Sequence, residues 1–303
     1  MCTAISFYTK DHYFGRNLDL EYSYNETITI TPRNYPLHFR YKDALKKHYA
    51  IIGMAYIQDS YPLYYEATNE KGLSMAALYF PGNAEYKPYI TGKNNVAPFE
   101  FIPWVLAQCE SVKAAHELFS NLNLVQEDYS SELPSTPLHW IISDQVESLT
   151  VESVKTGLRI YANHLNALTN NPPFDQQLAH WNEFYVRYCP TEVPGDLASE
   201  SRFIRVVNTK RNSICGSSEI ESVNQFFHFL SSVEYTKGLS KVAEDRYKTT
   251  IYSSCCNMDK GIYYYKTYNN SQISAVNMHH ENLESAQLIS YPLLTEPKIN
   301  WQN

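Results

Sequence analysis

The sequence predicts an α+β protein in which stacked sheets carry helices on their outer faces. Short strand-like runs fill both ends of the chain, and stretches with helical spacing lie between them. The breaks within the first strand-rich region are too short for crossover helices and therefore favour antiparallel pairing. No internal repeat or low-complexity linker interrupts the 303 residues, so we expect a single domain spanning 1–303.

The N-terminal third is the most strand-rich region. Runs of β-branched and aromatic residues alternate there with polar breaks such as YTKD, YSYN and NEKG. We expect these runs to form one antiparallel meander. The strands are expected in TAISF (3–7), HYFGRNLDL (12–20), ETITITPR (26–33), HYAIIGMAYI (48–57), YPLYYEAT (61–68) and LSMAALYF (73–80).

Helices are expected in the middle of the chain. Apolar residues recur at helical spacing after a potential N-cap at Ser111, at Val112, Ala115, Phe119 and Leu122. A second helical pattern covers 223–233. Further strands are expected in HWIISD (139–144), SLTVES (148–153), LRIYAN (158–163), KTTIYSS (248–254), GIYYYKTY (261–268) and QISAVNM (272–278).

Composition excludes several classes of function. The net charge of −7 argues against nucleic-acid binding, which relies on Lys and Arg to neutralise phosphates. No stretch approaches the roughly 20 apolar residues of a membrane helix, and no secretory signal is visible, so we expect a cytoplasmic protein with no membrane contact. The six cysteines lack C-x-x-C spacing, which disfavours a zinc site or a redox pair, and no metal is expected.

Cys2 suggests a chemistry of its own. If Met1 is removed, Cys2 carries a thiol and a free α-amine on one residue. A free thiol has a pKa of about 8.5 and an α-amine one of about 7.7–8.0, so proton exchange between them costs little. Such a residue is a nucleophile with its own base and needs no distant histidine.

Arg16 and Asp19 are candidates to support this nucleophile. If 12–20 pairs antiparallel with 3–7, Arg16 can favour the thiolate and Asp19 can hold the ammonium. The resting state would then be a thiolate and ammonium pair, whose ammonium protonates the leaving amine. An Arg and an Asp at this separation are also typical of a surface ion pair, so the residues alone leave both interpretations open.

Several blocks of the chain resemble the choloylglycine hydrolase family, which contains bile salt hydrolases and penicillin V acylases. The blocks follow family order from residue 1 to about 283: MCTAISF, FGRNLDLEYSYNE, ITPRNYPL, NEKGLSMAALYFPGNA, PLHWIISD, LTNNPPFD, PGDLASESRFIRV and IYSSCCNMDKGIYYYKTYNNSQI. The sequence of these blocks is most similar to bile salt hydrolases of Gram-positive gut bacteria. The resemblance implies the αββα four-layer sandwich of N-terminal-nucleophile hydrolases, an amidase activity and no cofactor.

The resemblance also assigns roles to individual residues. It implies Cys2 as the nucleophile, Arg16 beside the sulfur, Asp19 as the carboxylate that holds the α-amine, Asn170 as the oxyanion donor and Arg202 as the arginine of the site. From the residues alone, Asn170 before two prolines is equally a turn former. Arg202 is equally a solvated charge on a helix face, together with Arg205.

Two features depart from the family pattern. Tyr79 stands where most bile salt hydrolases have asparagine, and tyrosine there resembles the penicillin V acylases, in which backbone N–H serves the oxyanion. The segment between Phe184 and Pro194 is shorter than the arm that the family uses to contact neighbouring subunits and wall the site. The first departure bears on substrate choice, and the second on activity and assembly.

The expected function is hydrolysis of glycine- or taurine-conjugated bile acids through a Cys2 thioester. The alternatives are a penicillin V acylase and a weakly active homologue that binds bile acids without turnover. By family analogy the substrate-binding candidates are Tyr22, Tyr24, Ile57, Tyr61 and Leu133, although both Tyr22 and Tyr24 also suit the surface end of a strand. The expected partner is a small molecule, and the resemblance implies a homo-oligomer, a dimer or tetramer.

Overall fold

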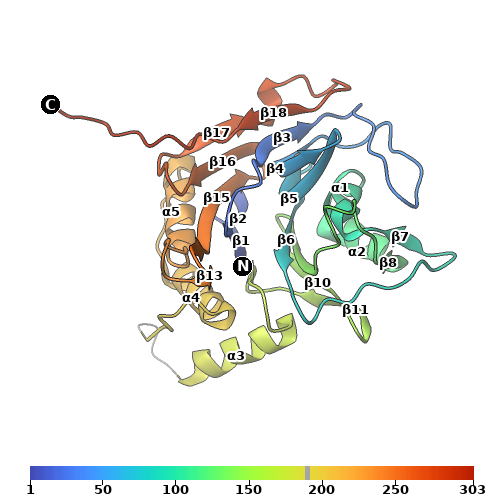
Figure 1. Ribbon diagram of the computed structural model, residues 1–303. Helices are drawn as coiled ribbons and strands as arrows, with labels where there is room; N and C mark the ends of the chain where they lie inside the picture. The colour runs from blue at the N-terminus through green and yellow to red at the C-terminus, as the bar shows by residue number, and fades with distance from the viewer. Residues whose placement is uncertain (188–191) are drawn as a thin grey trace.

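A computed structural model, which describes residues 1–187 and 192–303, contains two large antiparallel sheets stacked face to face. Helices α3, α4 and α5 lie outside the six-stranded sheet, and α1 and α2 lie outside the eight-stranded sheet (Figure 1). The order of layers is therefore helix, sheet, sheet, helix, as expected.

The six-stranded sheet joins the first two strands of the chain to three strands between residues 249 and 277. β1 and β2 form a hairpin inside this sheet, and β15 pairs with the free edge of β2. The strand order is β12 (Ala167–Leu168), β1 (Cys2–Tyr8), β2 (His12–Leu20), β15 (Thr249–Asn257), β16 (Ile262–Thr267) and β17 (Ser274–Asn277).

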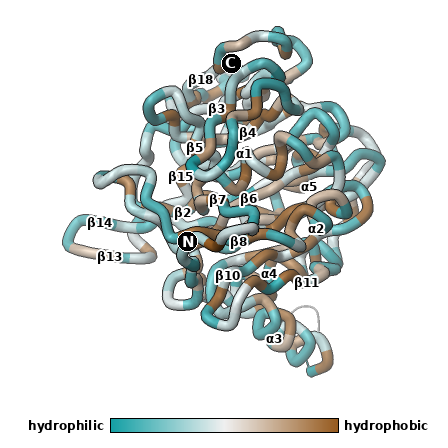
Figure 2. The backbone as a smooth tube through the Cα atoms, turned by 90° about the vertical axis from the view of Figure 1, so that its right-hand side faces the viewer, coloured by the Kyte–Doolittle hydropathy of each residue, from teal (hydrophilic) through white to brown (hydrophobic). Residues whose placement is uncertain are grey.

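The eight-stranded sheet contains the remaining long strands. Its order is β11 (Gly157–Ala162), β10 (Ser148–Val154), β9 (Leu138–Ser143), β6 (Ser74–Tyr79), β5 (Tyr61–Asn69), β4 (Ile51–Gln58), β3 (Thr27–Thr31) and β18 (Ile289–Pro292). Two short pairs lie outside these sheets: β7 (Asn94–Val96) with β8 (Leu122–Leu124), and β13 (Lys241–Ala243) with β14 (Arg246–Tyr247). The β13–β14 hairpin projects from the body of the molecule (Figure 2).

The expected single meander in the N-terminal third is wrong, because its six strands divide between the two sheets. β1 and β2 belong to the six-stranded sheet, whereas β3, β4, β5 and β6 form the meander in the other. Almost every residue of β1 and β2 is buried, which requires cover on both faces of this hairpin. The helices cover one face and the second sheet covers the other.

The helices are α1 (Phe101–Leu106), α2 (Val112–Phe119), α3 (Phe174–Arg187), α4 (Ser199–Asn212) and α5 (Glu219–Ser231), with short 3₁₀ turns at Pro98–Glu100 and Met278–His280. The expected N-cap is confirmed, because Ser111 Oγ accepts a hydrogen bond from Ala114 N. Placing Leu122 in this helix is wrong. Ser120 Oγ donates to Glu117 O at the helix end, and Leu122 pairs with β7 instead.

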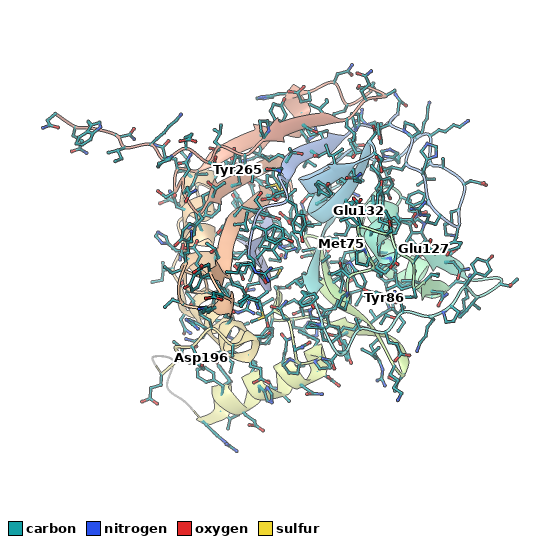
Figure 3. The ribbon with its side chains drawn as sticks, viewed as in Figure 1. Met75, Tyr86, Glu127, Glu132, Asp196 and Tyr265 are labelled. Atoms are coloured by element: carbon teal, nitrogen blue, oxygen red, sulfur yellow. The ribbon has the colours of Figure 1, made fainter. Side chains whose placement is uncertain are left out.

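The alternation of side chains along the strands builds two hydrophobic cores. In β6, Ala76 and Leu78 face the core between the sheets, whereas Met75 and Ala77 face the core under α1 and α2. Side chains fill the space between the two sheets, and labelled Met75 and Tyr265 lie on opposite sheets (Figure 3). None of the helices in the described ranges is long and apolar enough to span a membrane.

Candidate active site

Cys2 is the first residue of β1 and lies at one end of the hairpin in the middle of the six-stranded sheet. The predicted antiparallel pairing is confirmed, with Cys2 opposite Leu18 and Ala4 opposite Arg16. This register places Arg16 and Asp19 on the strand beside the cysteine. Both side chains are fully buried, so the alternative of a surface ion pair is wrong.

Arg16 is held at the point where β5 and β6 stop pairing. Its Nη1 donates to Tyr65 O at 3.1 Å and to Ala77 O at 2.5 Å. Nη2 is buried and has no hydrogen-bond partner in the part of the chain that the structure describes. Burial opposes the charge, but the Cys2 thiol and nearby acidic groups outweigh it and raise the pKa of Arg16. Arg16 therefore remains a cation, and its Nη2 is available as a hydrogen-bond donor next to the thiol.

Asp19 contacts the N-terminal residue through its backbone and Thr250 through its carboxylate. The Met1 amine donates to Asp19 O at 2.7 Å, and Asp19 N donates to Met1 O at 3.0 Å. Thr250 Oγ1 donates to Asp19 Oδ1 at 2.6 Å, while Oδ2 is buried without a partner among the described residues. Burial raises the pKa of Asp19, although Arg202 and the chain's amino group counteract it.

Asn170 connects Cys2 to the other sheet. Its Oδ1 accepts hydrogen bonds from Cys2 N and Arg202 Nη2, both at 2.8 Å, and its Nδ2 donates to Tyr79 O at 2.7 Å. Its own backbone is held by Ser199 Oγ and Gln177 Nε2, at 2.8 and 2.7 Å. Asn170 is thus a fixed, buried amide beside Cys2, which a plain turn former would not be.

Arg202 extends from α4 to the start of β1. Its Nη1 donates to Cys2 O and to Thr3 Oγ1, each at 2.6 Å, and its guanidinium lies 5.5 Å from the centre of the Tyr235 ring. The side chain is fully buried, so the solvated-charge alternative is wrong for Arg202. Arg205 instead binds the carbonyls of Gly195 and Asp196 at the protein surface.

Tyr79 ends β6 with its side chain 42% exposed and its backbone next to Asn170. It pairs opposite Leu138, and the next residue, Phe80, donates to Pro137 O. Hydrogen-bonded and non-hydrogen-bonded pairs alternate in antiparallel strands, so Tyr79 N–H points away from β9. It points to the same edge as Ala77 O, which binds Arg16. The backbone N–H of Tyr79 therefore faces the region of Arg16 and Asn170.

The substrate-binding candidates form parts of an aromatic rim, defined here as Tyr22, Tyr24, Tyr56, Tyr61 and Tyr129. The hydroxyls of Tyr22 and Tyr24 are 3.0 Å apart, and the Tyr24 ring lies 6.2 Å from the Tyr56 ring. The Tyr61 ring lies 6.1 Å from that of Tyr129, whose hydroxyl donates to Gln58 O at the end of β4, beside the β4–β5 turn. The two groups are thus linked through this turn.

Ile57 and Leu133 lie beside the rim. Ile57 is a half-buried residue of β4, adjacent to Tyr56, and Leu133 O accepts a hydrogen bond from Tyr129 N at 3.1 Å. Tyr22 and Tyr24 are 53% and 39% exposed, so both remain compatible with a surface role as well. Leu133 is thus bonded to the rim, whereas Ile57 adjoins the rim only along β4, because neighbouring strand residues point to opposite faces.

The sequence reasoning missed the groups that hold the site residues in place. The clearest are Glu66, Gln177, Ser199 and Thr250, all buried and hydrogen-bonded to site residues or to their neighbours. A carboxylate in the middle of a buried strand, as in YYEAT, was the available signal for Glu66. The others depend on contacts that only the folded chain creates.

Other expectations concern thiols, metals and the shortened segment. The adjacent Cys255 and Cys256 are both buried and free in β15, as two packed thiols would be. Within the described ranges no group of three acidic, His or Cys side chains could hold a metal ion. Residues 188–191 of the shortened segment, including Cys189, lie outside the described residues, and α3 ends at Arg187.

Comparison with known proteins shows extensive similarity. A bile salt hydrolase/transferase of Lactiplantibacillus plantarum is 50% identical over 317 positions, which cover 98% of each chain. Another bile salt hydrolase/transferase, from Clostridium perfringens, is 37% identical and covers both chains fully. Because 317 positions exceed the 303 residues of this chain, the Lactiplantibacillus relative carries residues that are absent here.

Solved structures agree with these relatives. A mutant of conjugated bile acid hydrolase from Clostridium perfringens matches with a TM-score of 0.92 and 37% identity over the full length of both chains. Penicillin V acylase from Agrobacterium tumefaciens has a TM-score of 0.80 at 17% identity, covering 95% of this chain and 90% of that one, and so shares the fold. The model of the choloylglycine hydrolase family, linear amide C–N hydrolases, matches residues 2–291. The chain therefore belongs to the choloylglycine hydrolase family.

Proposed function

We propose that the protein hydrolyses the amide bond of glycine- or taurine-conjugated bile acids through a thioester on Cys2. The observation that carries this proposal is the set of unsatisfied groups around the buried cysteine. Arg16 Nη2 and Asp19 Oδ2 are both buried and unpartnered within the described ranges, on the strand that pairs with β1. A buried polar atom without a hydrogen-bond partner is costly, so the retention of two such atoms here favours a functional role.

Removal of Met1 is the first step that this chemistry requires. The peptide bond between Met1 and Cys2 otherwise blocks the α-amine that serves as the base. Once Met1 is removed, the amino group of Cys2 occupies the position of the present Cys2 N, which lies 2.8 Å from Asn170 Oδ1. The negative charge of Asp19 then favours the ammonium form of this amine, and the positive charge of Arg16 favours the thiolate.

The thiolate attacks the amide carbonyl, forming a carbon–sulfur bond and an oxyanion. Asn170 Nδ2 and the backbone N–H of Tyr79 are the proposed oxyanion donors, since both lie at the same strand edge. Collapse of the intermediate breaks the carbon–nitrogen bond, and the ammonium of Cys2 gives its proton to the departing amine. The resulting amine then deprotonates a water molecule, which attacks the thioester and releases the bile acid and the thiolate.

The aromatic rim is the proposed steroid-binding surface. Its rings supply broad apolar area, and the hydroxyls of Tyr22 and Tyr24 offer donors and acceptors for the polar substituents of a sterol acid. Tyr61 contributes a hydroxyl that is buried without a partner in the described part of the chain. Tyr22, Tyr24, Ile57, Tyr61 and Leu133 are therefore retained as binding candidates.

A penicillin V acylase is the second candidate. The tyrosine at position 79 favours it, because the Tyr79 backbone oxygen binds Asn170 and the side chain is partly exposed, so the ring can contact the acyl group of a bound substrate. Transfer of the acyl group to an amine instead of to water is a further outcome of the same thioester. The two relatives named bile salt hydrolase/transferase support its inclusion in an assay.

The oligomeric state and compartment are also proposals. A homo-oligomer, dimer or tetramer, is supported by the exposed apolar side chains of Tyr185 and Val186 at the end of α3, which are 60% and 83% exposed. A cytoplasmic location is supported by the free state of every described cysteine, since a reducing compartment maintains thiols. Sedimentation of the purified protein tests the first proposal, and cell fractionation tests the second.

The test of the function is a substrate panel on the purified protein. Glycocholate, taurocholate and penicillin V are incubated with the wild type and with Cys2→Ser, and the released amine is quantified. We expect cysteine-dependent release of glycine and taurine at rates well above that from penicillin V. Faster turnover of penicillin V would assign the acylase function, and binding of bile acid without release would assign the inactive homologue.

A further inference from the structure

We propose that Glu66 is a positioning residue that acts on the nucleophile through Arg16: its buried negative charge compensates that of Arg16 and so sets the acidity of the Cys2 thiol. The proposal rests on the function proposed above, for which it names a residue outside the expected set. Glu66 lies in β5, on the face that packs against the six-stranded sheet. Its Oε2 is 3.8 Å from Arg16 Nε, with both side chains almost fully buried.

Three hydroxyls of the opposite sheet converge on this carboxylate. Tyr252 OH donates to Oε2 at 2.7 Å, and Tyr263 OH and Ser254 Oγ donate to Oε1 at 2.5 and 3.0 Å. Ser254 Oγ also accepts a hydrogen bond from Arg16 N at 3.2 Å, so this hydroxyl links Glu66 to the Arg16 backbone. An ionised carboxylate only accepts hydrogen bonds, so this arrangement suits a negatively charged Glu66.

Glu66 leaves one side of Arg16 free for the cysteine. Nη1 is used by two strand carbonyls, and Nε faces Glu66 and the backbone oxygen of Asn17. Nη2 is the remaining nitrogen and is buried without a partner in the described ranges. Glu66 and the thiolate therefore compete for the same positive charge from two sides of the guanidinium.

Other ionisable groups surround this pair from each neighbouring element. Burial raises the pKa of Glu66, while Arg16 and the three hydroxyls counteract it. Burial and the Glu66 charge keep the pKa of both Tyr252 and Tyr263 well above the usual value, so both remain donors. The charged or titratable groups facing Glu66, Arg16 and Cys2 are Asp19, Tyr65, Arg202, Tyr235, Cys256 and the chain's amino group.

The test is the pH profile of Cys2 alkylation by iodoacetamide, followed by mass spectrometry of the N-terminal peptide in the mature protein. Glu66→Gln keeps the shape and removes the charge, leaving Arg16 uncompensated. We expect the apparent thiol pKa to fall by about one pH unit, the magnitude of a nearby charge effect. The acid limb of kcat/KM for the preferred substrate should move by the same amount in the same direction.

Two further variants make the result decisive. Glu70→Gln is the matched control, because Glu70 lies in the same hairpin, pairs with Arg33 and contacts no site residue, and its profile should match the wild type. Glu66→Asp retains the charge at a greater distance and should give an intermediate shift. If Glu66→Gln does not fold, the thiol pKa of Glu66→Asp tests the proposal in its place.

An unchanged or raised thiol pKa in a folded Glu66 variant would overturn the proposal, since a purely structural role lowers stability without moving that pKa. Alkylation needs no substrate. A wild type that alkylates normally but hydrolyses neither bile salts nor penicillin V would therefore contradict the proposed function and leave the Glu66 test valid.

Discussion

The surroundings of Cys2 and the aromatic rim differ in how tightly the fold holds them. Around Cys2, the side chains of Arg16, Asp19, Asn170 and Arg202 are buried, and each is held by a hydrogen bond to a backbone atom or, for Asp19, to the Thr250 hydroxyl. Tyr22 and Tyr24 instead stand partly exposed and hydrogen-bond mainly to each other. We therefore expect the buried region to be sensitive to substitution and the rim to tolerate it.

This contrast separates the chemistry of the reaction from the choice of substrate. Groups held by buried hydrogen bonds act on charges that develop at the reacting atoms, so their loss should lower kcat. Exposed rings contribute binding area that is equal in the ground and transition states, so their loss should raise KM. Substitutions in the two regions should therefore have different kinetic signatures.

The largest effect is expected for Asp19→Asn, which removes the charge that favours the ammonium. Activity should fall by roughly 10²–10⁴-fold, as for the loss of an acid–base group. Stability should rise at neutral pH. Burial raises the pKa of Asp19, so the folded protein holds this proton to higher pH than the unfolded chain, and the contribution of Asp19 to stability falls as pH rises above about 4.

Urea unfolding at pH 5 and pH 7 checks this prediction, with the stability gain of Asp19→Asn larger at pH 7. Asp11 in the β1–β2 turn is the control with the opposite sign, because its hydrogen bond with Lys260 lowers its pKa. Asp11→Asn should lose a little stability and no activity. A loss of stability in Asp19→Asn at pH 7 would contradict the account.

Asn170→Ala should have the next largest effect. It removes an oxyanion donor and the acceptor for Cys2 N, so kcat should fall roughly 10²–10³-fold with a smaller change in KM. Asn171→Ala is a matched neighbour, since that side chain binds Pro81 O and Asn83 rather than the cysteine. Equal losses in the two variants would show that Asn170 acts only by holding the loop.

Tyr24→Ala should raise KM for conjugated bile salts about fivefold and leave kcat almost unchanged. The loss corresponds to about 1 kcal/mol of binding, as for a partly exposed aromatic contact. Steady-state kinetics provide the measurement. Tyr8→Ala is the control, because Tyr8 is 65% exposed at the opposite end of β1 and should not affect KM. A fall in kcat alone for Tyr24→Ala would place this ring in the chemistry instead.

The smallest effect on activity is expected for Lys210→Met, at the far end of α4. Lys210 Nζ donates to Ser6 O, Leu165 O and Asn166 O, and burial lowers its pKa to about 7. The unfolded chain keeps this proton to about pH 10.4, so it binds more protons than the folded protein between pH 7 and 10. The contribution of Lys210 to stability therefore rises with pH over that range.

The free energy of unfolding of the wild type should therefore rise by about 2 kcal/mol relative to that of Lys210→Met from pH 7 to pH 9. Urea unfolding at both values provides the test, with exposed Lys113→Met as the control that shows no such change. A constant difference would mean that Lys210 stays charged throughout. Activity per folded molecule should be unaffected.

The local part of the fold and site was predictable from the sequence. Strand periodicity located β1 and β2, and their short turn required antiparallel pairing, which brings Arg16 and Asp19 beside Cys2. Ser111 marked the start of α2 because capping is a local effect. These features depend on residues close together in the chain.

The remainder depends on long-range contacts that one sequence does not specify. The N-terminal strands divide between two sheets because β2 pairs with β15, which lies near the other end of the chain. Asn170 and Arg202 reach Cys2 from distant elements, and only the family resemblance assigned them to the site. Glu66 was missed because its partners Tyr252 and Tyr263 come from the opposite sheet.

The central claim is that Cys2, freed of Met1, carries the acyl group during turnover. Intact-mass spectrometry of the purified protein, before and after rapid acid quenching with glycocholate, tests it most directly. The account predicts the mass of the chain without Met1, and after quenching a second species heavier by one choloyl group that is absent in Cys2→Ser. A protein that turns over glycocholate while retaining Met1, or without any acylated species on Cys2, would contradict it.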